Sequence, residues 1–426
     1  MKHSLHFVML ALSLSCALLS GNALAGFNEG LKAYKKGDYS TALREWQPLA
    51  LAGDADAQVN LGVMHEAGQG VPKDDKKAVK WFQLAAVQGN ADAQYGVGKM
   101  YAEGRGVPQD YKEAVKWFQL ASAQGDAVAQ HGLAVMYEKG HGVSQDYKEA
   151  LRLYFLAADQ RLVSAQFSLG MMYFNGWGVP RDYNQAVEWF LLAAKQNYAA
   201  AQSKLGDMYF VGIGIAKDYD EAFKWYRHAA DQGIARAQYL LGQLYAMGLG
   251  VPEDRQEALK LYRLAADQGE PNAHFNLGMA YETGWGVPQD NVEAIRLFRL
   301  AADQKLSVAQ YTLGLVYAEG RAGGRQDYKE AIKWFRLAGA QRYDAALYSL
   351  GLMYSGGNGV SLNRVLAYAL FDLVKFAVPS LVNKSQTNRN NLAAVMSAKE
   401  IETAQNLARE MGRSGNFHKA MDGYAR

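Results

Sequence analysis

Through most of this chain the apolar positions return in the same order every 36 residues, with a one-residue slip before Ala346. In one unit, Ala93, Val97, Met100 and Tyr101 follow the i, i+4, i+7, i+8 spacing of a single helix face, which predicts a first helix from about Asp92 to Glu103. A fixed period of this length indicates a solenoid, in which stacked units bury their faces only against their neighbours. The alanines that begin the units, most of them followed by glutamine, are Ala57, Ala93, Ala129, Ala165, Ala201, Ala237, Ala273, Ala309 and Ala346.

Each unit also predicts a second helix with defined ends. Glycines such as Gly104 and Gly106 end the first helix, because glycine readily takes the left-handed cap conformation. Asp110 then precedes the second helix and Glu113 follows three residues later, which predicts a capping box in which both side chains accept hydrogen bonds from backbone amides. Four caps between units lack glycine: Arg161, Asn197, Lys305 and Arg342. Asparagine tolerates the left-handed region best, so we expect local strain or a different turn at the other three.

Small and flexible residues inside the first helix indicate close packing. Gly98 and its counterpart Gly170 carry no side chain, so a neighbouring helix can approach closely at these points. Six methionines share one position, three residues after the repeated leucine, which favours a core-filling role over an adaptable binding groove. These methionines are Met64, Met100, Met136, Met172, Met208 and Met353.

The repeated string, Ala-Gln-x-x-Leu-Gly-x-x-Tyr-x-x-Gly-x-Gly-Val-x-x-Asp-Tyr-x-x-Ala-x-x-Trp-Phe-x-x-Ala-Ala-x-x-Gly, resembles the Sel-one-like repeat, a relative of the tetratricopeptide repeat. The resemblance covers residues 57–375 in nine consecutive units. Together with the period, it predicts an all-α fold, an α/α solenoid that forms a right-handed superhelix. The resemblance further implies that the first helices line the concave side. It also implies an adaptor role in the cell envelope, in exopolysaccharide assembly or at a host surface.

The beginning of the chain has the pattern of a secretory signal peptide. Lys2 provides a positive charge, an apolar run extends from Leu5 to Leu19, and small residues precede the predicted cleavage point between Ala25 and Gly26. We therefore expect an exported protein, periplasmic or secreted. Cys16 lies inside the predicted signal, so the processed chain would contain no cysteine and no disulfide.

The chain is predicted to have four parts. They are a signal peptide at 1–25, an atypical tetratricopeptide-like opening unit at 26–56, nine repeats at 57–375, and a C-terminal helical cap and tail at 376–426. Terminal units of a solenoid are expected to be atypical because one of their faces meets water. In the last part, Ser397 and Glu400 predict another capping box, which begins a helix that extends to about Met411. A frayed tail is expected from Gly412.

Charge and chemistry exclude several function classes. Lys and Arg number 45 against 42 Asp and Glu, a balance that argues against a nucleic-acid surface. No run beyond the predicted signal approaches the ~20 apolar residues of a membrane span. The histidines lack zinc-ligand spacing, and the Gly-x-Gly-Val-Pro loops lack the lysine of a phosphate loop and the alternating acids of a calcium loop. We therefore predict no metal, no cofactor and no catalytic residues.

Three positions of the first helix, two, six and nine residues after its first alanine, are predicted to form a stripe opposite the packing face. In this stripe Phe167, Met171, Phe174 and Phe210 predict an apolar patch, and Asp207, Tyr239 and Gln243 extend it. Variation from unit to unit is typical of a binding surface, but also of unconstrained solvent-facing positions. Two loop-tip tryptophans are candidate contact anchors or packing residues of a neighbouring loop: Trp177 and Trp285.

These patterns favour a non-catalytic scaffold that binds a protein or peptide on its concave face, with an envelope or host-surface protein as a candidate partner. One alternative is a carbohydrate or cell-wall binder, for which tryptophans such as Trp177 and Trp285 would serve as platforms. Another is a hydrolase related to secreted family members that have been linked to β-lactams. The paired cysteines of those members are absent here.

Overall fold

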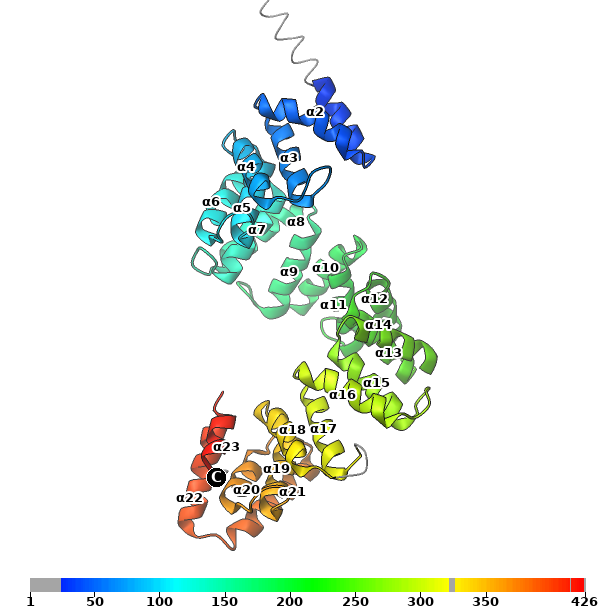
Figure 1. The fold of residues 1–426 in the computed structure, drawn as a ribbon, viewed down its shortest axis with the longest axis vertical. Helices are drawn as coiled ribbons and strands as arrows, with labels where there is room; N and C mark the ends of the chain where they lie inside the picture. Colours follow the sequence, from blue (N-terminus) through cyan, green and yellow to red (C-terminus); the bar gives the residue numbers. More distant parts are fainter. Residues whose placement is uncertain (1–23, 322–325, 414, 425–426) are drawn as a thin grey trace, which may run out of the picture. The chain divides into compact units, whose positions relative to one another are not determined.

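The computed structural model describes residues 24–321, 326–413 and 415–424. Within these ranges the chain is helical and contains no strand. It divides into two compact units, Met1–Lys217 and Asp218–Arg426, and in each unit successive helices form hairpins that pack on the next hairpin (Figure 1). The predicted all-α solenoid of helical hairpins is confirmed. Most of the predicted signal peptide lies outside the described residues.

The first unit contains the opening hairpin and the first repeats. Residues 24–35 form a helix that precedes α2. The following helices are α2 (Tyr39–Leu51), α3 (Ala55–Ala67), α4 (Asp75–Ala86), α5 (Ala91–Glu103), α6 (Tyr111–Ala123), α7 (Ala127–Lys139), α8 (Tyr147–Asp159), α9 (Val163–Asn175), α10 (Tyr183–Lys195) and α11 (Ala199–Val211).

The second unit continues the repeats and adds the C-terminal helices. Its helices are α12 (Tyr219–Asp231), α13 (Ala235–Met247), α14 (Arg255–Asp267), α15 (Pro271–Thr283), α16 (Asn291–Asp303), α17 (Ser307–Glu319), α18 (Tyr328–Ala340), α19 (Asp344–Gly356), α20 (Arg364–Leu373), α21 (Pro379–Ala393), α22 (Ala398–Met411) and α23 (Phe417–Tyr424).

The two helices of a repeat approach each other at a glycine. A Cβ atom on Gly98 would lie 2.7 Å from the ring of Phe118, and one on Gly170 would overlap the ring of Phe190. Side chains cannot approach so closely, so the predicted close approach is confirmed. In one repeat Ala134 takes the place of this glycine and is fully buried. The shared methionine position also fills the core, since Met64, Met100, Met136, Met172 and Met208 are buried, although Met353 is only half-buried.

The glutamine that follows the first alanine in most repeats joins consecutive repeats, a role that the sequence analysis missed. Gln94 Nε2 donates to the carbonyl of Ala86 in the preceding repeat at 3.2 Å, and Gln94 Oε1 accepts from Gln124 at 2.8 Å. A buried amide needs such partners, because an unsatisfied polar group in the core costs free energy. Equivalent side-chain pairs, separated by 30 or 31 residues, are Gln58–Gln88, Gln130–Gln160, Gln166–Gln196, Gln238–Gln268 and Gln310–Gln341.

Only half of each predicted capping box forms at the second helices. Asp110 accepts from the amides of Lys112 and Glu113, as predicted. The amide of Asp110 donates to the carbonyl of Tyr101, at 3.0 Å, instead of to Glu113. Glu113 consequently pairs with Lys116 one turn later, at 2.7 Å. The prediction that both side chains cap the helix is therefore wrong, because the preceding loop already satisfies the aspartate amide.

The four caps without glycine keep the same turn as the others. Arg161, Asn197, Lys305 and Arg342 have φ values between 64° and 66°, in the left-handed region. Of the two predicted outcomes, the structure shows the strained left-handed residue and not a different turn.

The C-terminal part folds back on the last repeat. Ser397 and Glu400 form the predicted reciprocal capping box at the start of α22. The segment from Gly412 is not a frayed tail, because it contains α23, which packs against α18 and α22. Phe417 and Met421 of α23 are buried, so hydrophobic contact holds this helix in place.

Candidate partner-binding surface

In several repeats the residue directly after the cap glycine of the first helix, here called the loop-tip position, reaches back to the preceding repeat. Arg105 bonds to Asp75, His141 stacks on Tyr111 with ring centres 4.4 Å apart, and Trp177 stacks on Tyr147. In each case the contacted residue lies 30 positions earlier, at the start of the preceding repeat's second helix. The loop tips are therefore packing positions whose chemistry changes from repeat to repeat.

Trp177 lies flat on its neighbour. Its ring centre is 5.8 Å from that of Tyr147 with an interplanar angle of 16°, and the indole is half-buried against the core that contains Met172 and Leu153. Such stacking adds to simple area burial. Of the two interpretations of Trp177, the structure favours packing on the neighbouring repeat.

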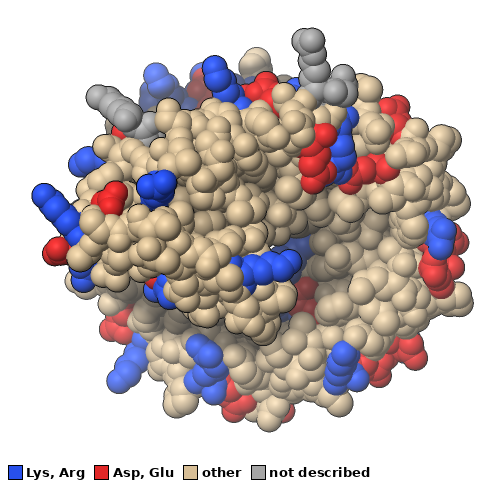
Figure 2. All heavy atoms as spheres, turned by 90° about the horizontal axis from the view of Figure 1, so that it is seen from below, with Lys and Arg blue, Asp and Glu red and all other residues tan. Residues whose placement is uncertain are grey.

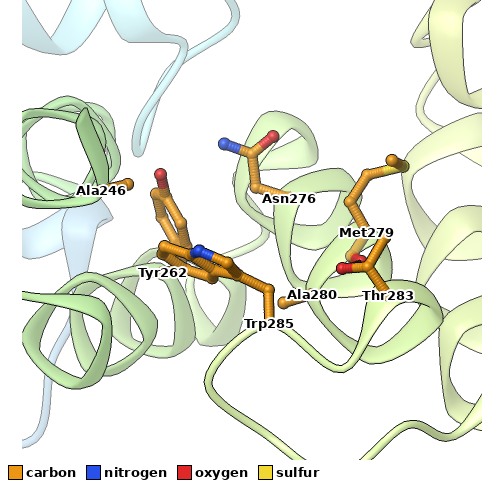
Figure 3. Close-up of a pocket in the computed structure, with 7 residues that line it drawn as sticks. All are labelled: Ala246, Tyr262, Asn276, Met279, Ala280, Thr283 and Trp285. Carbon is orange, nitrogen blue, oxygen red and sulfur yellow. Dashed lines mark hydrogen bonds between the residues drawn. The ribbon is translucent and has the colours of Figure 1, made fainter.

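Trp285 has a different neighbour and borders a cavity. The residue at the place of Tyr147 is Arg255, whose guanidinium carbon lies 5.7 Å from the centre of the Trp285 ring. The indole lines a cavity of about 290 Å³ (Figure 3). The other lining residues come from three helices of the second unit: Ala246 from α13, Tyr262 from α14, and Asn276, Met279, Ala280 and Thr283 from α15.

The first column of the predicted stripe is a packing column. Phe167 lies 5.5 Å from Phe190 and 5.3 Å from Tyr198 between ring centres, and Tyr239 lies 5.9 Å from Tyr262. Placing this column opposite the packing face was wrong, because its rings pack on the second helix of their own repeat. The same ring pair recurs as Tyr95–Phe118, His131–Tyr154, Phe275–Phe298, Tyr311–Phe335 and Tyr348–Phe371.

The predicted apolar patch of the first unit is half-buried and not openly exposed. Phe167, Met171, Phe174 and Phe210 all have intermediate accessibility, as does Asp207. The ammonium of Lys204 lies 3.8 Å from the centre of the Phe174 ring. Phe174 also meets Tyr183 edge-on, with ring centres 5.2 Å apart. A cation over an aromatic face is a favourable contact, so part of this patch is already covered.

Two predicted residues of the second unit are also half-buried, Tyr239 and Gln243. Burial raises the pKa of Tyr239, and hydrogen bonds with Gln243 and Asn276 oppose that effect. The phenol therefore stays neutral in the physiological range. Gln243 lies beside the Tyr239 phenol and is half-buried like it.

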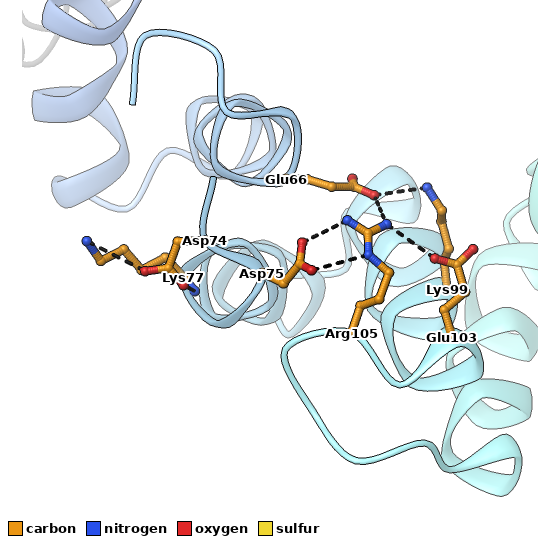
Figure 4. Close-up of polar contacts among 7 residues, drawn as sticks. All are labelled: Glu66, Asp74, Asp75, Lys77, Lys99, Glu103 and Arg105. Carbon is orange, nitrogen blue, oxygen red and sulfur yellow. Dashed lines mark hydrogen bonds and ion pairs between the residues drawn. The ribbon is translucent and has the colours of Figure 1, made fainter. Parts of the chain in front are cut away.

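An ion-pair cluster occupies the loop-tip position near the start of the first unit (Figure 4). Arg105 pairs with Glu66 and with Asp75 at 2.7 Å each, and with Glu103 at 3.2 Å; Lys99 adds a 3.0 Å contact to Glu66. In the second unit Arg321 contacts Glu282 and Glu319 in the same register. These side chains connect one repeat to the next, and their charges are largely paired within the protein.

The remaining surface charge is mixed. Figure 2 shows basic and acidic side chains interspersed over the visible face, with no broad field of one sign. Across the described residues, no group of three or more His, Cys, Asp or Glu could hold a metal ion. His131 is half-buried, and burial lowers its pKa to about 4, so it is neutral at physiological pH. No helix in the described ranges is long and apolar enough to cross a membrane.

The Trp285 cavity is the feature of the site that the sequence analysis missed, although a signal was present. At the shared methionine position, one repeat carries Ala280. Such a truncation of a core residue creates space when its neighbours do not collapse.

Comparison with known proteins places these hairpins in a family. The model of the Sel1 repeat matches nine consecutive segments: residues 55–90, 91–126, 127–162, 163–198, 199–234, 235–270, 271–306, 307–343 and 344–373. No match is found among the curated proteins.

Two solved structures share the fold with substantial identity. One is a protective antigen present in uropathogenic Escherichia coli strains that displays an SLR fold; it is 30% identical with a TM-score of 0.57, over 97% of this chain and 94% of that chain. The other is a Sel1 repeat protein from Oxalobacter formigenes, 32% identical with a TM-score of 0.53, over 57% of this chain and 96% of that chain.

Proposed function

The chain belongs to the Sel1 repeat family, and from this premise we propose that it is a non-catalytic scaffold that binds a protein or peptide partner. Proteins of this family are generally protein-interaction scaffolds. One observation carries the proposal for this chain: the packing positions repeat almost unchanged, whereas the partly accessible stripe positions six and nine residues after the first alanine change from Met171 and Phe174 to Asp207 and Phe210 and then to Gln243 and Ala246. A constant framework with a variable surface is what a repeat protein needs to recognise a particular partner.

The proposed location is the cell envelope or the exterior of the cell. The signal-peptide pattern with cleavage between Ala25 and Gly26 supports export. The similar Escherichia coli protein is described as a protective antigen, which accords with a protein that acts at or beyond the cell surface. N-terminal sequencing of the exported protein tests this directly, with Gly26 as the expected first residue.

Affinity capture tests the scaffold function. The full processed chain is immobilised, exposed to envelope and culture-medium fractions, and the retained proteins are identified by mass spectrometry. Specific retention of one partner, competed by free chain, supports the function. Turnover of a hydrolase substrate by the purified chain, with no protein retained, overturns it.

A matched variant assigns the binding to a region. Phe174→Ser with Phe210→Ser alters the half-buried patch of the first unit, and unchanged helicity and melting show that the fold is intact. Reduced capture by a folded double variant places the partner on this patch. If the variant unfolds, both rings belong to the core, and the binding surface lies elsewhere.

A carbohydrate binder is the second candidate, favoured by the indole of Trp285 at the edge of a cavity. Sugars commonly stack on such rings. A glycan array, probed with the wild type and with Trp285→Arg, separates the two functions: saccharide binding that the substitution abolishes would favour the carbohydrate.

A further inference from the structure

The cavity beside Trp285 is formed by two consecutive hairpins of the second unit, α13–α14 and α15–α16. Its volume is about 290 Å³. This is close to the lower end of typical ligand pockets and suits one large side chain with its backbone. Figure 3 shows Asn276, Met279 and Thr283 on one side and Ala246 and Tyr262 on the other, with the indole of Trp285 overlapping Tyr262 in this view.

The cavity follows from small residues at two positions of the repeat. Ala280 stands where Met100 and Met172 fill the core in other repeats, and both of those methionines are fully buried. Ala246 stands at a position held by Phe174 or Phe210 in the first unit. Protein cores are close-packed, so missing side-chain volume at adjacent positions leaves a space that neighbours do not fill.

The walls of the cavity are uncharged. Indole, thioether and methyl groups of Trp285, Met279, Ala246 and Ala280 supply the apolar part, and no Asp, Glu, Lys or Arg lines it. Arg255 covers one face of the indole and pairs with Glu253 at 2.9 Å. A charged ligand would therefore lose its hydration without gaining a counter-charge.

Few polar groups are available inside the cavity. The hydroxyl of Thr283 donates to the carbonyl of Met279 at 2.7 Å, and the phenols of Tyr239 and Tyr262 lie near the Asn276 amide. A primary amide has two donors and two acceptor lone pairs, so Asn276 retains capacity for one more partner. A sugar ring would bring several hydroxyl groups into this space and leave most of them unsatisfied.

We propose that this cavity receives one uncharged apolar side chain, of the leucine, methionine or phenylalanine type, from a partner polypeptide. The backbone amide next to that side chain pairs with Asn276. The proposal rests on the scaffold function and deepens it, since it names the chemistry of the anchor residue. Buried apolar anchors in preformed pockets carry much of the affinity of protein interfaces.

The test uses the full chain with isotope-labelled methionine methyl groups, and Met279→Leu identifies the Met279 signal by NMR. The probes are N-acetyl-leucine methylamide, N-acetyl-phenylalanine methylamide, N-acetyl-glutamate methylamide and N-acetylglucosamine. The leucine and phenylalanine amides are expected to shift the Met279 signal with dissociation constants of about 1 mM, as suits ligands of this size. The glutamate amide and the sugar are expected to leave it unchanged.

Two variants establish that the cavity itself is the site. Ala280→Met fills the cavity with the residue that most repeats carry there, so it folds, and it should weaken apolar-amide binding at least about tenfold. Trp285→Arg removes the indole and places at the loop tip the residue found at Arg105 and Arg321. Trp177→Arg, the matched change in the first unit, should leave the Met279 response unaltered.

Three results would overturn the proposal: no Met279 shift with either apolar amide, a shift of equal size with the sugar, or unchanged binding by Ala280→Met. Partner capture separates this failure from failure of the function. If the amides do not bind but the wild type retains a protein, the cavity is not the site and the scaffold function stands. If the amides bind and no protein is retained, the scaffold function fails.

Discussion

Trp177 and Trp285 hold the same loop-tip position, one in each compact unit, and their surroundings differ. Trp177 stacks on Tyr147 above a core filled by Met172. Trp285 has Arg255 over its ring and a cavity of about 290 Å³ beside it. The same residue is thus a packing element in one repeat and a cavity wall in another.

Substitutions elsewhere in the repeat, and not at the tryptophan, make the difference. The stacking partner changes from tyrosine to arginine, and the core residue beneath changes from Met172 to Ala280. The second loop glycine also sits differently: a Cβ on Gly178 would lie 2.6 Å from the carbonyl oxygen of Tyr147, whereas one on Gly286 would meet Leu259. A repeat protein can therefore gain a pocket by removing volume from a core position, with the adjacent loop seated differently on the preceding hairpin.

The largest expected effect concerns what the two regions share, the close approach inside a repeat. Gly170→Leu forces the side chain into the ring of Phe190 and should lower the free energy of unfolding by about 2–4 kcal/mol. Thermal and denaturant unfolding measure this. Gly423→Ala is the control, because a Cβ there meets nothing within 4 Å. A melting temperature equal to that of the wild type would show that helix packing does not need the glycine.

Next in size is a change that makes the Trp177 region resemble the Trp285 region. Met172 is fully buried, so Met172→Ala should open a cavity and destabilise the protein by about 2 kcal/mol, the low end for such truncations. The reverse change, Ala280→Met, should cost less than about 1 kcal/mol or stabilise the protein. Denaturant midpoints of both variants test the pair. Equal losses for the two substitutions would contradict the cavity as the source of the difference.

Removing the two indoles should give a smaller, unequal effect. Trp177→Ala loses a stacked ring and its core contacts and should cost about 1–2 kcal/mol. Trp285→Ala should cost less than about 1 kcal/mol, since its ring already borders empty space. Chemical unfolding of the two single variants compares them. If Trp285 proves the more stabilising residue, its ring is packed more tightly than the cavity implies.

The smallest expected effect comes from a loop tip that uses charge in place of an aromatic ring. Arg105 is partly exposed, so Arg105→Ala should cost about 1 kcal/mol or less and depend on salt. Burial raises the pKa of Glu66, but hydrogen bonds from Lys99 and Arg105 outweigh it and hold the pKa below the ordinary 4.5.

The sign of the pH effect follows from that lowered pKa. Stability from the Glu66 carboxylate is present above pH 4.5 and is lost as the pH falls through the folded-state value. Unfolding midpoints of wild type and Arg105→Ala between neutral and acidic pH should therefore converge. A difference that persists at the acid end would assign the role of Arg105 to packing of its stem and not to charge.

The sequence by itself determined the helices of the nine repeats, their ends and most of the residues that join the two helices of a repeat. The period places Ala93, Val97 and Met100 on one face, Asp110 caps the second helix, and Gly98 marks the close approach. These features follow from interactions within one helix or one hairpin, which a local pattern contains.

Only the tertiary structure decided how consecutive repeats meet and where space remains. Gln94 reaches a carbonyl of the preceding repeat, and loop tips such as His141 and Trp177 contact residues 30 positions earlier. The side chain of Glu113 does not cap the helix, because the backbone amide of Asp110 already donates to the carbonyl of Tyr101. The inward packing of Phe167 and the cavity beside Ala280 depend on side chains from several helices at once. A helical period shows only which residues share one face of one helix.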